Sequence, residues 1–239
     1  MKKGFIYYKT LLDNIIIGYS DPKNELEYYI YDSHVKDNIY KFTSSQAREF
    51  IKKHHYSKGV VSNSFLHIGV YYKKELVGVL SLGWMINKHS CVNIHKDFKD
   101  INVIELNRMA FKDNLPRCIK SMSLSVVFKI LKHTKPYIKC VNSFSDDRCL
   151  KKGVVYQSSN FCYYGSKLSQ FLELDNKIYT SLTLTKTYTK IHKELYLPNK
   201  DKFKKIYIRQ YRYIYWLDKK YKKDCLLTEE KYPKQNITI

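Results

Sequence analysis

Short runs of apolar and β-branched residues, separated by charged or turn-forming residues, fill the first third of the chain. Such runs are typical of strands. The runs at Leu66–Tyr72 and Leu76–Leu82 flank Lys73-Lys74-Glu75 and predict a β-hairpin that Gly83 closes. Earlier runs at residues 4–8 and 26–31 lie on either side of turn-forming residues 20–24. They predict a hairpin-like start to the domain.

Helical spacing of apolar residues follows at three places. Thr43-Ser44-Ser45-Gln46 supplies N-cap candidates, and Ala47, Phe50 and Ile51 then recur at helical intervals. We therefore expect a helix that delivers the chain to His54-His55-Tyr56. Residues 121–132 predict a second helix, which Pro136 ends, and residues 153–160 predict a short third one.

Four further apolar runs complete the predicted sheet. They lie at residues 101–111, 137–144, 161–164 and 178–185. With the helices between them, they give β-α-β order in the second half of the chain. The pattern thus predicts a mixed α/β (α+β) domain over residues 1–185, with a central sheet flanked by helices.

The composition changes after Thr185. Residues 186–239 are rich in Lys, Arg and Tyr, and we expect them to form a basic, aromatic C-terminal extension packed on the domain or continuing it. Basic side chains contact phosphates, and aromatic faces stack on exposed bases. The alternation in Ile206–Trp216 fits equally an ordinary core strand with Lys and Arg outside, and both interpretations can hold at once. The candidate nucleic-acid contacts are Lys204, Lys205, Arg209, Tyr211 and Arg212.

The charge strengthens the case for a polyanionic partner. Of the 239 residues, 43 are Lys or Arg and 22 are Asp or Glu, which gives a net charge of +21. Nucleic acid is the leading candidate partner. The alternative is that the abundance of Lys and Tyr reflects an A/T-rich genome, and that the charged side chains only form a solvated surface.

Cysteine spacing and hydropathy indicate the cellular compartment in which the protein works. The six cysteines are dispersed without a C-x-x-C pair, so neither a zinc ribbon nor a disulfide framework is predicted. No apolar run approaches the roughly 20 residues that cross a bilayer. We expect a soluble, intracellular protein with reduced thiols.

Polar residues gather at the ends of the predicted elements, where segments that are distant in sequence can converge. Asp146 and Asp147 follow a short apolar strand, and Tyr156 lies in the helix after them. His55 and Tyr56 end the first helix, while Glu105 and Arg108 lie in a strand. A His beside a Tyr is more often a structural pair than a catalytic one, and spacing alone leaves both options open.

Several motifs, taken in order, resemble a known family. The order of elements and the Gly-x-x-Tyr-x-x-x-x-Phe segment resemble the GNAT acyltransferase fold. More closely, residues 45–170 resemble the Mom family of phage DNA-modification proteins. The motifs that carry this resemblance are His54-His55-Tyr56-Ser57-Lys58, Gly69-Val70-Tyr71-Tyr72, Leu76-Val77-Gly78-Val79, Glu105-Leu106-Asn107-Arg108, Leu115-Pro116-Arg117, Ser121, Ser143-Phe144-Ser145-Asp146 and Tyr156-Gln157-Ser158-Ser159-Asn160-Phe161.

The resemblance implies an activity and a set of functional residues. The implied activity is modification of the exocyclic N6 amine of adenine in phage DNA, giving a methylcarbamoyl-type adduct that protects the DNA from restriction enzymes. The family's link to an acyl-CoA donor and to iron implies acetyl-CoA, and an iron site of one imidazole, one carboxylate and one or two phenols, with His55 and Asp146 as the first candidates for ligands. The resemblance also implies double-stranded DNA as the partner and the cytoplasm of a bacterial host as the compartment. The residues at positions that the family treats as functional are His55, Tyr56, Arg108, Ser121, Asp146 and Tyr156.

One departure from the GNAT pattern affects the donor. A GNAT enzyme holds the pyrophosphate of CoA with a Gly-rich loop at a helix N-terminus. The matching segment here, residues 113–121, contains no glycine. Arg117, Lys120, Ser121 and Asn160 are the remaining candidates for holding a donor, and an aminoacyl-tRNA fits both the missing loop and the charge.

The expected roles follow from the weak nucleophilicity of an aromatic amine. Asp146 accepts the amine proton or hydrogen-bonds it, Tyr156 protonates or stabilises the leaving side, and Arg108 binds a phosphate or a developing negative charge. Two other interpretations stay open: an ordinary GNAT N-acetyltransferase acting on a protein or a small amine, and a non-catalytic nucleic-acid-binding module.

Overall fold

The computed structural model describes residues 6–9, 16–21, 25–34, 42–149, 152–185, 187 and 189–234. Residues 4, 5 and 22–24 of the expected N-terminal hairpin lie outside them. Ten strands form one sheet in the order β1-β2-β3-β4-β5-β6-β7-β10-β8-β9. The strands are β1 Ile6–Lys9, β2 Ile16–Asp21, β3 Leu26–Asp32, β4 Ser64–Tyr72, β5 Glu75–Trp84, β6 Val103–Phe111, β7 Cys140–Asp146, β8 Cys162–Leu174, β9 Lys177–Thr180 and β10 Lys204–Trp216.

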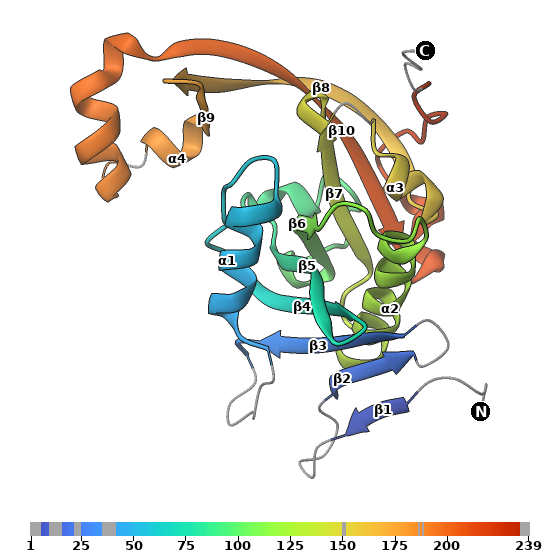
Figure 1. The fold of residues 1–239 in the computed structure, drawn as a ribbon. Coiled ribbons are helices and arrows are strands. Elements are labelled where there is room, and N and C mark those ends of the chain that lie inside the picture. Colours follow the sequence, from blue (N-terminus) through green and yellow to red (C-terminus); the bar gives the residue numbers. More distant parts are fainter. Residues whose placement is uncertain are drawn as a thin grey trace.

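Helices cover both faces of the sheet, so the expected mixed α/β class is confirmed (Figure 1). On one face, α1 buries Ala47 and Ile51 against Val79 of β5. On the other face, α2 buries Leu124 and Leu131 among the strands. The helices are α1 Ser44–His54, α2 Ile119–Thr134, α3 Val154–Ser158 and α4 Ser181–Thr185, and short 3-10 or π turns are η2 Lys88–Cys91, η3 Asp100–Asn102, η4 Asp147–Cys149, η5 His192–Tyr196, η6 Leu197–Lys202 and η7 Lys219–Asp224.

Local signals in the sequence explain the elements that lead to the site. Thr43 caps α1, and its side chain and that of Gln46 cap each other's backbone N–H groups. The β4–β5 hairpin forms as expected, with Lys73 and Lys74 both at positive φ in its two-residue turn. Such φ values belong to the type I′ turn that fits the twist of a hairpin.

Two expectations for the C-terminal half are wrong. The strand expected at 178–185 ends at Thr180, and residues 181–185 form α4. The alternation of Leu and Thr there has the period of a strand, but the Thr185 hydroxyl bonds the Ser181 carbonyl one helical turn earlier. The strand expected at 161–164 continues to Leu174 because β10 pairs with it along most of its length.

The C-terminal segment continues the sheet. β10 lies between β7 and β8 and is antiparallel to both. Figure 1 shows β8 and β10 extending beyond the other strands as a two-stranded ribbon, which carries β9, α4 and residues 189–203 at its far end. We call β9, α4 and residues 189–203 the lobe.

The expected reduced state of the cysteines agrees with the structure, in which all six are free. None of the helices in the described residues is long and apolar enough to cross a membrane.

Candidate active site

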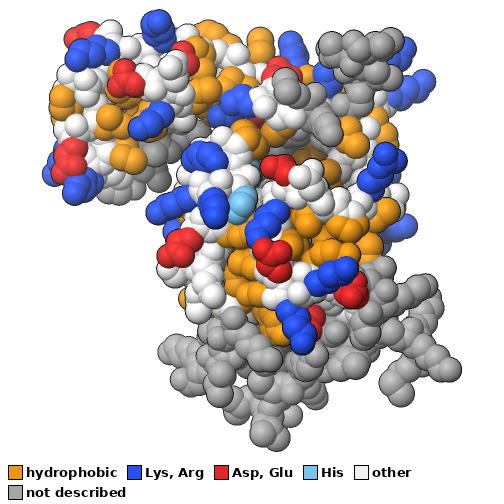
Figure 2. Space-filling view, in the orientation of Figure 1, with side chains coloured by type: hydrophobic (Ala, Val, Ile, Leu, Met, Phe, Trp, Pro, Cys, Tyr) orange, Lys and Arg blue, Asp and Glu red, His pale blue; other side chains and the backbone are white. Residues whose placement is uncertain are grey.

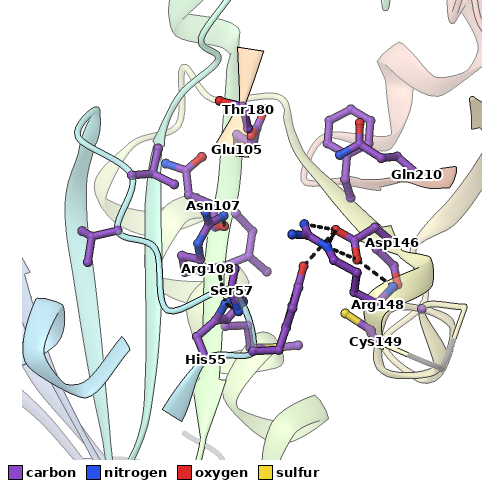
Figure 3. A pocket seen from close by; sticks show the side chains of 18 of the residues that line it. His55, Ser57, Glu105, Asn107, Arg108, Asp146, Arg148, Cys149, Thr180 and Gln210 are labelled. Carbon is purple, nitrogen blue, oxygen red and sulfur yellow. Dashed lines mark hydrogen bonds and ion pairs between the residues drawn. The ribbon is translucent and has the colours of Figure 1, made fainter. Parts of the chain in front are cut away.

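A pocket of about 930 Å³ opens where two parallel strands separate. β6 and β7 pair only from Val103↔Cys140 to Glu105↔Asn142, and their later halves diverge. Residues from both diverging halves line the pocket, together with the loop after α1 and parts of β8, β10 and the lobe. Figure 3 shows His55 and Arg108 on one side of this pocket and Asp146 and Arg148 on the other.

The end of α1 places His55 and Tyr56. His55 is the C-cap of the helix, and its backbone N–H donates to Ile51 O. Its Nδ1 accepts a hydrogen bond from Ser57 N at 3.2 Å and lies 2.8 Å from Ser57 Oγ. An accepting Nδ1 leaves the ring hydrogen on Nε2. Burial and then the charge of Arg108 lower the pKa of His55 to about 3, so the imidazole is neutral at pH 7.

Tyr56 joins this loop to the opposite wall. Although 46% of its surface is exposed, its hydroxyl points inward and donates to Asp146 Oδ2 at 3.2 Å, across 90 residues of sequence. Burial, followed by the nearby Cys149 and Asp146, raises the pKa of Tyr56. The phenol is therefore a hydrogen-bond donor in the pocket.

Asp146, at the end of β7, is only 4% exposed and holds a close ion pair with Arg148. Its Oδ1 accepts from the backbone N–H of Arg148 at 3.1 Å and from Arg148 Nε at 3.2 Å. Its Oδ2 accepts from Arg148 Nη2 at 2.5 Å. Burial opposes the charge of Arg148, but the hydrogen bonds and charge of Asp146 outweigh this effect and raise the pKa of Arg148.

Arg108, in β6, is held by backbone carbonyls. Its Nε donates to Gly59 O at 2.8 Å, and its Nη1 donates to Asn107 O at 2.6 Å. These bonds tie the loop after α1 to the sheet. Burial lowers the pKa of Arg108, although an arginine remains a cation at neutral pH.

Tyr156 closes the α3 side of the gap between the strands. The Ser143 hydroxyl lies 3.1 Å from Leu106 O and 2.9 Å from Tyr156 Oη. Because Ser143 has one hydroxyl hydrogen, it donates to the carbonyl, and Tyr156 donates to Ser143. Burial raises the pKa of Tyr156 to about 12, so its hydroxyl keeps its proton at pH 7.

A second carboxyl, that of Glu105, lines the pocket on β6. Asn142 Nδ2 lies 3.4 Å from Glu105 Oε2. Burial raises the pKa of Glu105, with Asn142 and Arg108 acting in the opposite direction. The two carboxyl groups of the pocket thus differ: a bidentate arginine neutralises Asp146, whereas burial favours the neutral form of Glu105.

The candidate donor-binding residues lie apart. Lys120, in the first turn of α2, lines the pocket. Arg117 precedes the helix and is exposed, and Ser121 Oγ donates to Cys118 O at 3.0 Å. Asn160 is exposed beyond α3, with a left-handed φ of 61°. Lys120 alone among the four borders the pocket.

Two of the five candidate nucleic-acid contacts are not available on the surface. Lys204, Lys205 and Arg209 are exposed on β10. Tyr211 is 5% exposed and donates to Asp147 Oδ1 at 2.9 Å, so its ring cannot stack on a base in this arrangement. Arg212 is half-buried, with Cζ 5.4 Å from the ring centroid of Phe144. Both belong to the part of β10 that pairs with β7 as well as β8, whereas Lys204, Lys205 and Arg209 pair with β8 alone.

The expected iron site does not fit these contacts. Among the residues that the structure describes, no three His, Cys, Asp or Glu side chains gather so as to hold a metal ion. Both oxygens of Asp146 already accept hydrogen bonds, and Nδ1 of His55 is engaged by Ser57. The phenols of Tyr56 and Tyr156, the further donors expected for this site, keep their protons and bond Asp146 and Ser143. The expected set of imidazole, carboxylate and phenol ligands is therefore not free to hold iron.

The sequence that forms this site matches a known protein family. A model of the Mom protein family matches residues 38–234. This chain belongs to the Mom protein family. The methylcarbamoylase Mom of Escherichia phage Mu is 38% identical over 192 residues, which cover 79% of this chain and 80% of that relative.

Two solved structures to which this chain is similar are acetyltransferases. Ribosomal-protein-S5-alanine acetyltransferase from Vibrio fischeri has a TM-score of 0.46 at 9% identity, covering 81% of this chain and 94% of its own. An N-acetyltransferase from Staphylococcus aureus Mu50 has a TM-score of 0.45 at 9% identity, covering 80% and 97%.

Sequence reasoning missed Arg148 and Phe171, which line the pocket of this Mom protein. Arg148 follows Asp146 by two residues, and a carboxylate and a cation at that spacing beyond a strand end are a weak signal for a local pair. Phe171 carried no signal, because β8 reaches the pocket only through its long pairing with β10.

Proposed function

We propose that this Mom protein transfers a methylcarbamoyl-type group to the exocyclic N6 amine of adenine in DNA and thereby protects the DNA from restriction enzymes. Family membership and the name of the phage Mu relative support the reaction class. The observation that carries the proposal is the convergence of Tyr56 and Asp146, from two distant segments, on a pocket large enough for a nucleotide base.

In the proposed reaction, the adenine amine forms a bond to the carbonyl carbon of a donor that already carries the nitrogen of the methylcarbamoyl-type group. The bond from that carbon to the leaving group breaks, and the amine loses one proton. The amine is a weak nucleophile, so positioning and proton removal limit the rate. Asp146 accepts the amine hydrogen, and Tyr56 orients that carboxylate. Tyr156 exchanges its hydrogen bond to Ser143 for one to the leaving group and stabilises it.

His55 and Arg108 stabilise the negative charge that develops in the transition state. His55 is neutral and carries its hydrogen on Nε2, so it donates a hydrogen bond without a change of charge. Arg108 is a fixed cation held by two carbonyls. Fixed donors that need no rearrangement stabilise a transition state best.

The amine of adenine is stacked and paired in a duplex, so the base must be extruded to reach the pocket. We propose that the outer face of the β8–β10 ribbon contacts the DNA backbone. Lys205, Tyr207 and Arg209 alternate along β10 and therefore share one face. All three are exposed, Tyr207 by 64%. Figure 2 shows Lys and Arg side chains spread over the lobe and over the body below it.

For the donor, we propose a phosphate-bearing molecule at the N-terminal end of α2, an aminoacyl-tRNA, whose acyl group carries the nitrogen that a methylcarbamoyl-type adduct contains. Acetyl-CoA, the other candidate, supplies an acetyl group, which has no nitrogen. Lys120 borders the pocket there, and Arg117 and Ser121 lie in the same turn of chain. The backbone N–H groups of a helix start favour phosphate.

Mass spectrometry of nucleosides from cellular DNA after expression of the full chain tests the function. We expect a modified deoxyadenosine with the wild type, and its loss with His55→Ala. His54→Ala is the matched control, because His54 packs against Phe50 and does not line the pocket. An unmodified deoxyadenosine pool from folded wild-type protein would refute the proposal, and the mass of any adduct identifies the group transferred.

A further inference from the structure

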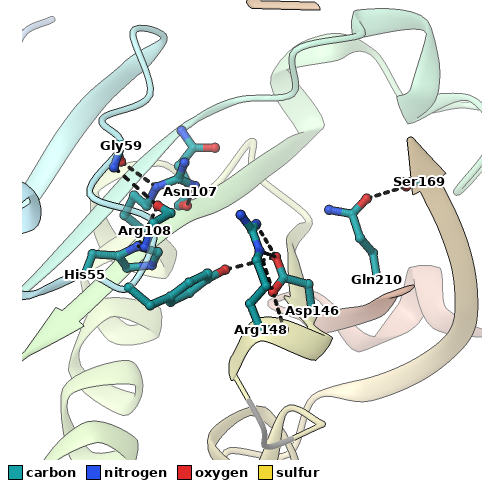
Figure 4. A network of polar contacts seen from close by, with 10 residues as sticks. His55, Gly59, Asn107, Arg108, Asp146, Arg148, Ser169 and Gln210 are labelled. Carbon is teal, nitrogen blue, oxygen red and sulfur yellow. Dashed lines mark hydrogen bonds and ion pairs between the residues drawn. The ribbon is translucent and has the colours of Figure 1, made fainter. Parts of the chain in front are cut away.

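The Arg148 guanidinium lies against groups that also bind an aromatic base, namely two aromatic rings and a carboxylate. Its Cζ lies over the Tyr56 ring at 5.2 Å from the centroid, and over the Phe171 ring at 5.2 Å. Its Nη2 donates to Asp146 Oδ2 at 2.5 Å. Figure 4 shows the guanidinium reaching from the turn after β7 into the space beside Asp146, on the side that faces Arg108.

A guanidinium and the amine edge of adenine are chemically alike. Both are planar, both present an NH₂ group bonded to an sp² carbon, and both stack on aromatic faces. We propose that the place of the Arg148 guanidinium, between Asp146 and the rings of Tyr56 and Phe171, is the binding subsite for the extruded purine base, and that Arg148 keeps it closed until a nucleotide phosphate draws the guanidinium away. This inference rests on the proposed function.

The hydrogen bonds of Asp146 require such an exchange. An ionised carboxylate offers about four lone-pair sites. Arg148 contributes three donors, its backbone N–H, Nε and Nη2, and Tyr56 contributes a fourth. The amine of a substrate therefore finds no free acceptor on Asp146 until the guanidinium leaves.

A phosphate is a suitable new partner for Arg148. Arginine binds phosphate and carboxylate with the same two-pronged geometry, so the guanidinium keeps an anionic partner when it exchanges one for the other. Asp146 then keeps the hydrogen bond from Tyr56 and gains one from the adenine amine. The side chain of Arg148 is 25% exposed, against 5% for that of Asp146, so the cation has a path to solvent that the carboxylate lacks. Closure by Arg148 thus makes the subsite selective for a base that arrives with its phosphate.

Equilibrium binding of deoxyadenosine, which has no phosphate, tests the subsite directly. We expect Arg148→Ala to bind deoxyadenosine at least tenfold more tightly than the wild type, while its rate of DNA modification falls at least tenfold. A merely structural role for Arg148 predicts no gain in binding. Adding Phe171→Leu to Arg148→Ala should remove most of the gain, because one wall of the stack is lost.

Arg48→Ala is the matched control, since Arg48 is a half-buried arginine whose Nε donates to Ser44 Oγ and which does not line the pocket. It should leave deoxyadenosine binding unchanged. If Arg148→Ala fails to fold, Arg148→Lys replaces it, with a smaller gain expected because the shorter cation still competes. Unchanged or weaker deoxyadenosine binding by the folded variant overturns the inference.

The two proposals fail separately. Wild-type protein that modifies DNA, combined with no gain in Arg148→Ala, would leave the function standing and refute the subsite. A gain in deoxyadenosine binding with no modification of DNA by the wild type would support the subsite and refute the transfer reaction.

Discussion

Two arginines face the pocket from opposite walls, and the structure holds them in different ways. Arg108, on β6, donates to two backbone carbonyls, those of Gly59 and Asn107. Arg148, in the turn after β7, donates to the carboxylate of Asp146. Carbonyls of the backbone are neutral and cannot move without moving the fold, whereas a carboxylate is an anion whose place another anion can take.

The difference indicates a division of labour between the walls. The β6 wall presents a fixed cation whose charge its direct partners do not neutralise. The β7 wall presents an ion pair in which the cation is the more exposed partner. The fixed cation of the β6 wall suits transition-state stabilisation, because its donors are already in place. The ion pair of the β7 wall suits substrate entry, because the cation can exchange the carboxylate for another anion and so open the pocket.

The largest expected effect comes from breaking the β7 pair at its carboxylate. In Asp146→Asn, we expect DNA modification to fall by about a hundredfold or more, the usual cost of losing a group that handles the transferred proton. The measurement is the rate of adduct formation per protein in purified DNA, followed by mass spectrometry of nucleosides.

Asp147→Asn is the control for that substitution. Asp147 is adjacent in sequence and also a carboxylate, but it accepts from Tyr211 and does not line the pocket. Its activity should stay within a few-fold of the wild type, because an amide oxygen still accepts that bond. An equal loss of modification activity in both variants would mean that the activity depends on the total negative charge of this turn and not on the carboxylate in the pocket.

A smaller effect should separate the two arginines. Arg108→Lys should reduce modification by about tenfold, because lysine cannot span both carbonyls and leaves a buried acceptor unsatisfied. Arg148→Lys should cost less, since a lysine can also exchange a carboxylate for a phosphate. The comparison uses kcat and KM on one duplex substrate: we expect Arg108→Lys to act on kcat and Arg148→Lys chiefly on KM. The reverse order would contradict the division of labour.

Short-range patterns predicted much of the fold and part of the site. The β4–β5 hairpin and α1 follow from turn and cap residues that act within a few positions, and α1 then places His55 and Tyr56. Asp146 was predicted from its place at a strand end, which the structure confirms. These features depend on neighbours in sequence, which is the information that periodicity carries.

Long-range pairing could not be predicted in the same way. β10 lies between β7 and β8, although more than 50 residues separate its start from the end of β7. That pairing buries Tyr211, extends β8 to Leu174, and brings Phe171 to the pocket. No local pattern distinguishes Tyr211, which is buried, from Tyr207, which is exposed, because both lie on one alternating strand.

The smallest expected effect concerns His55, whose pKa depends to a different extent on each of the two arginines. The pKa of His55 is lowered to about 3 by burial first, then by Arg108 and, more weakly, by Arg148. The folded state therefore binds fewer protons than the unfolded state between about pH 3 and the ordinary His pKa of about 6.5. The free energy of unfolding falls as pH decreases through this window, by about 2 kcal/mol at pH 5 from this residue alone.

His55→Asn should flatten that dependence, because asparagine has no proton to take up when the chain unfolds. Chemical denaturation at pH 7 and pH 5 measures it, and an unchanged difference between the two pH values would show that His55 is not held neutral. NMR titration of the His55 ring then separates the arginines. Arg108→Gln should move the pKa of His55 further toward its ordinary value than Arg148→Gln does, because the fixed cation contributes more to the shift than the paired one.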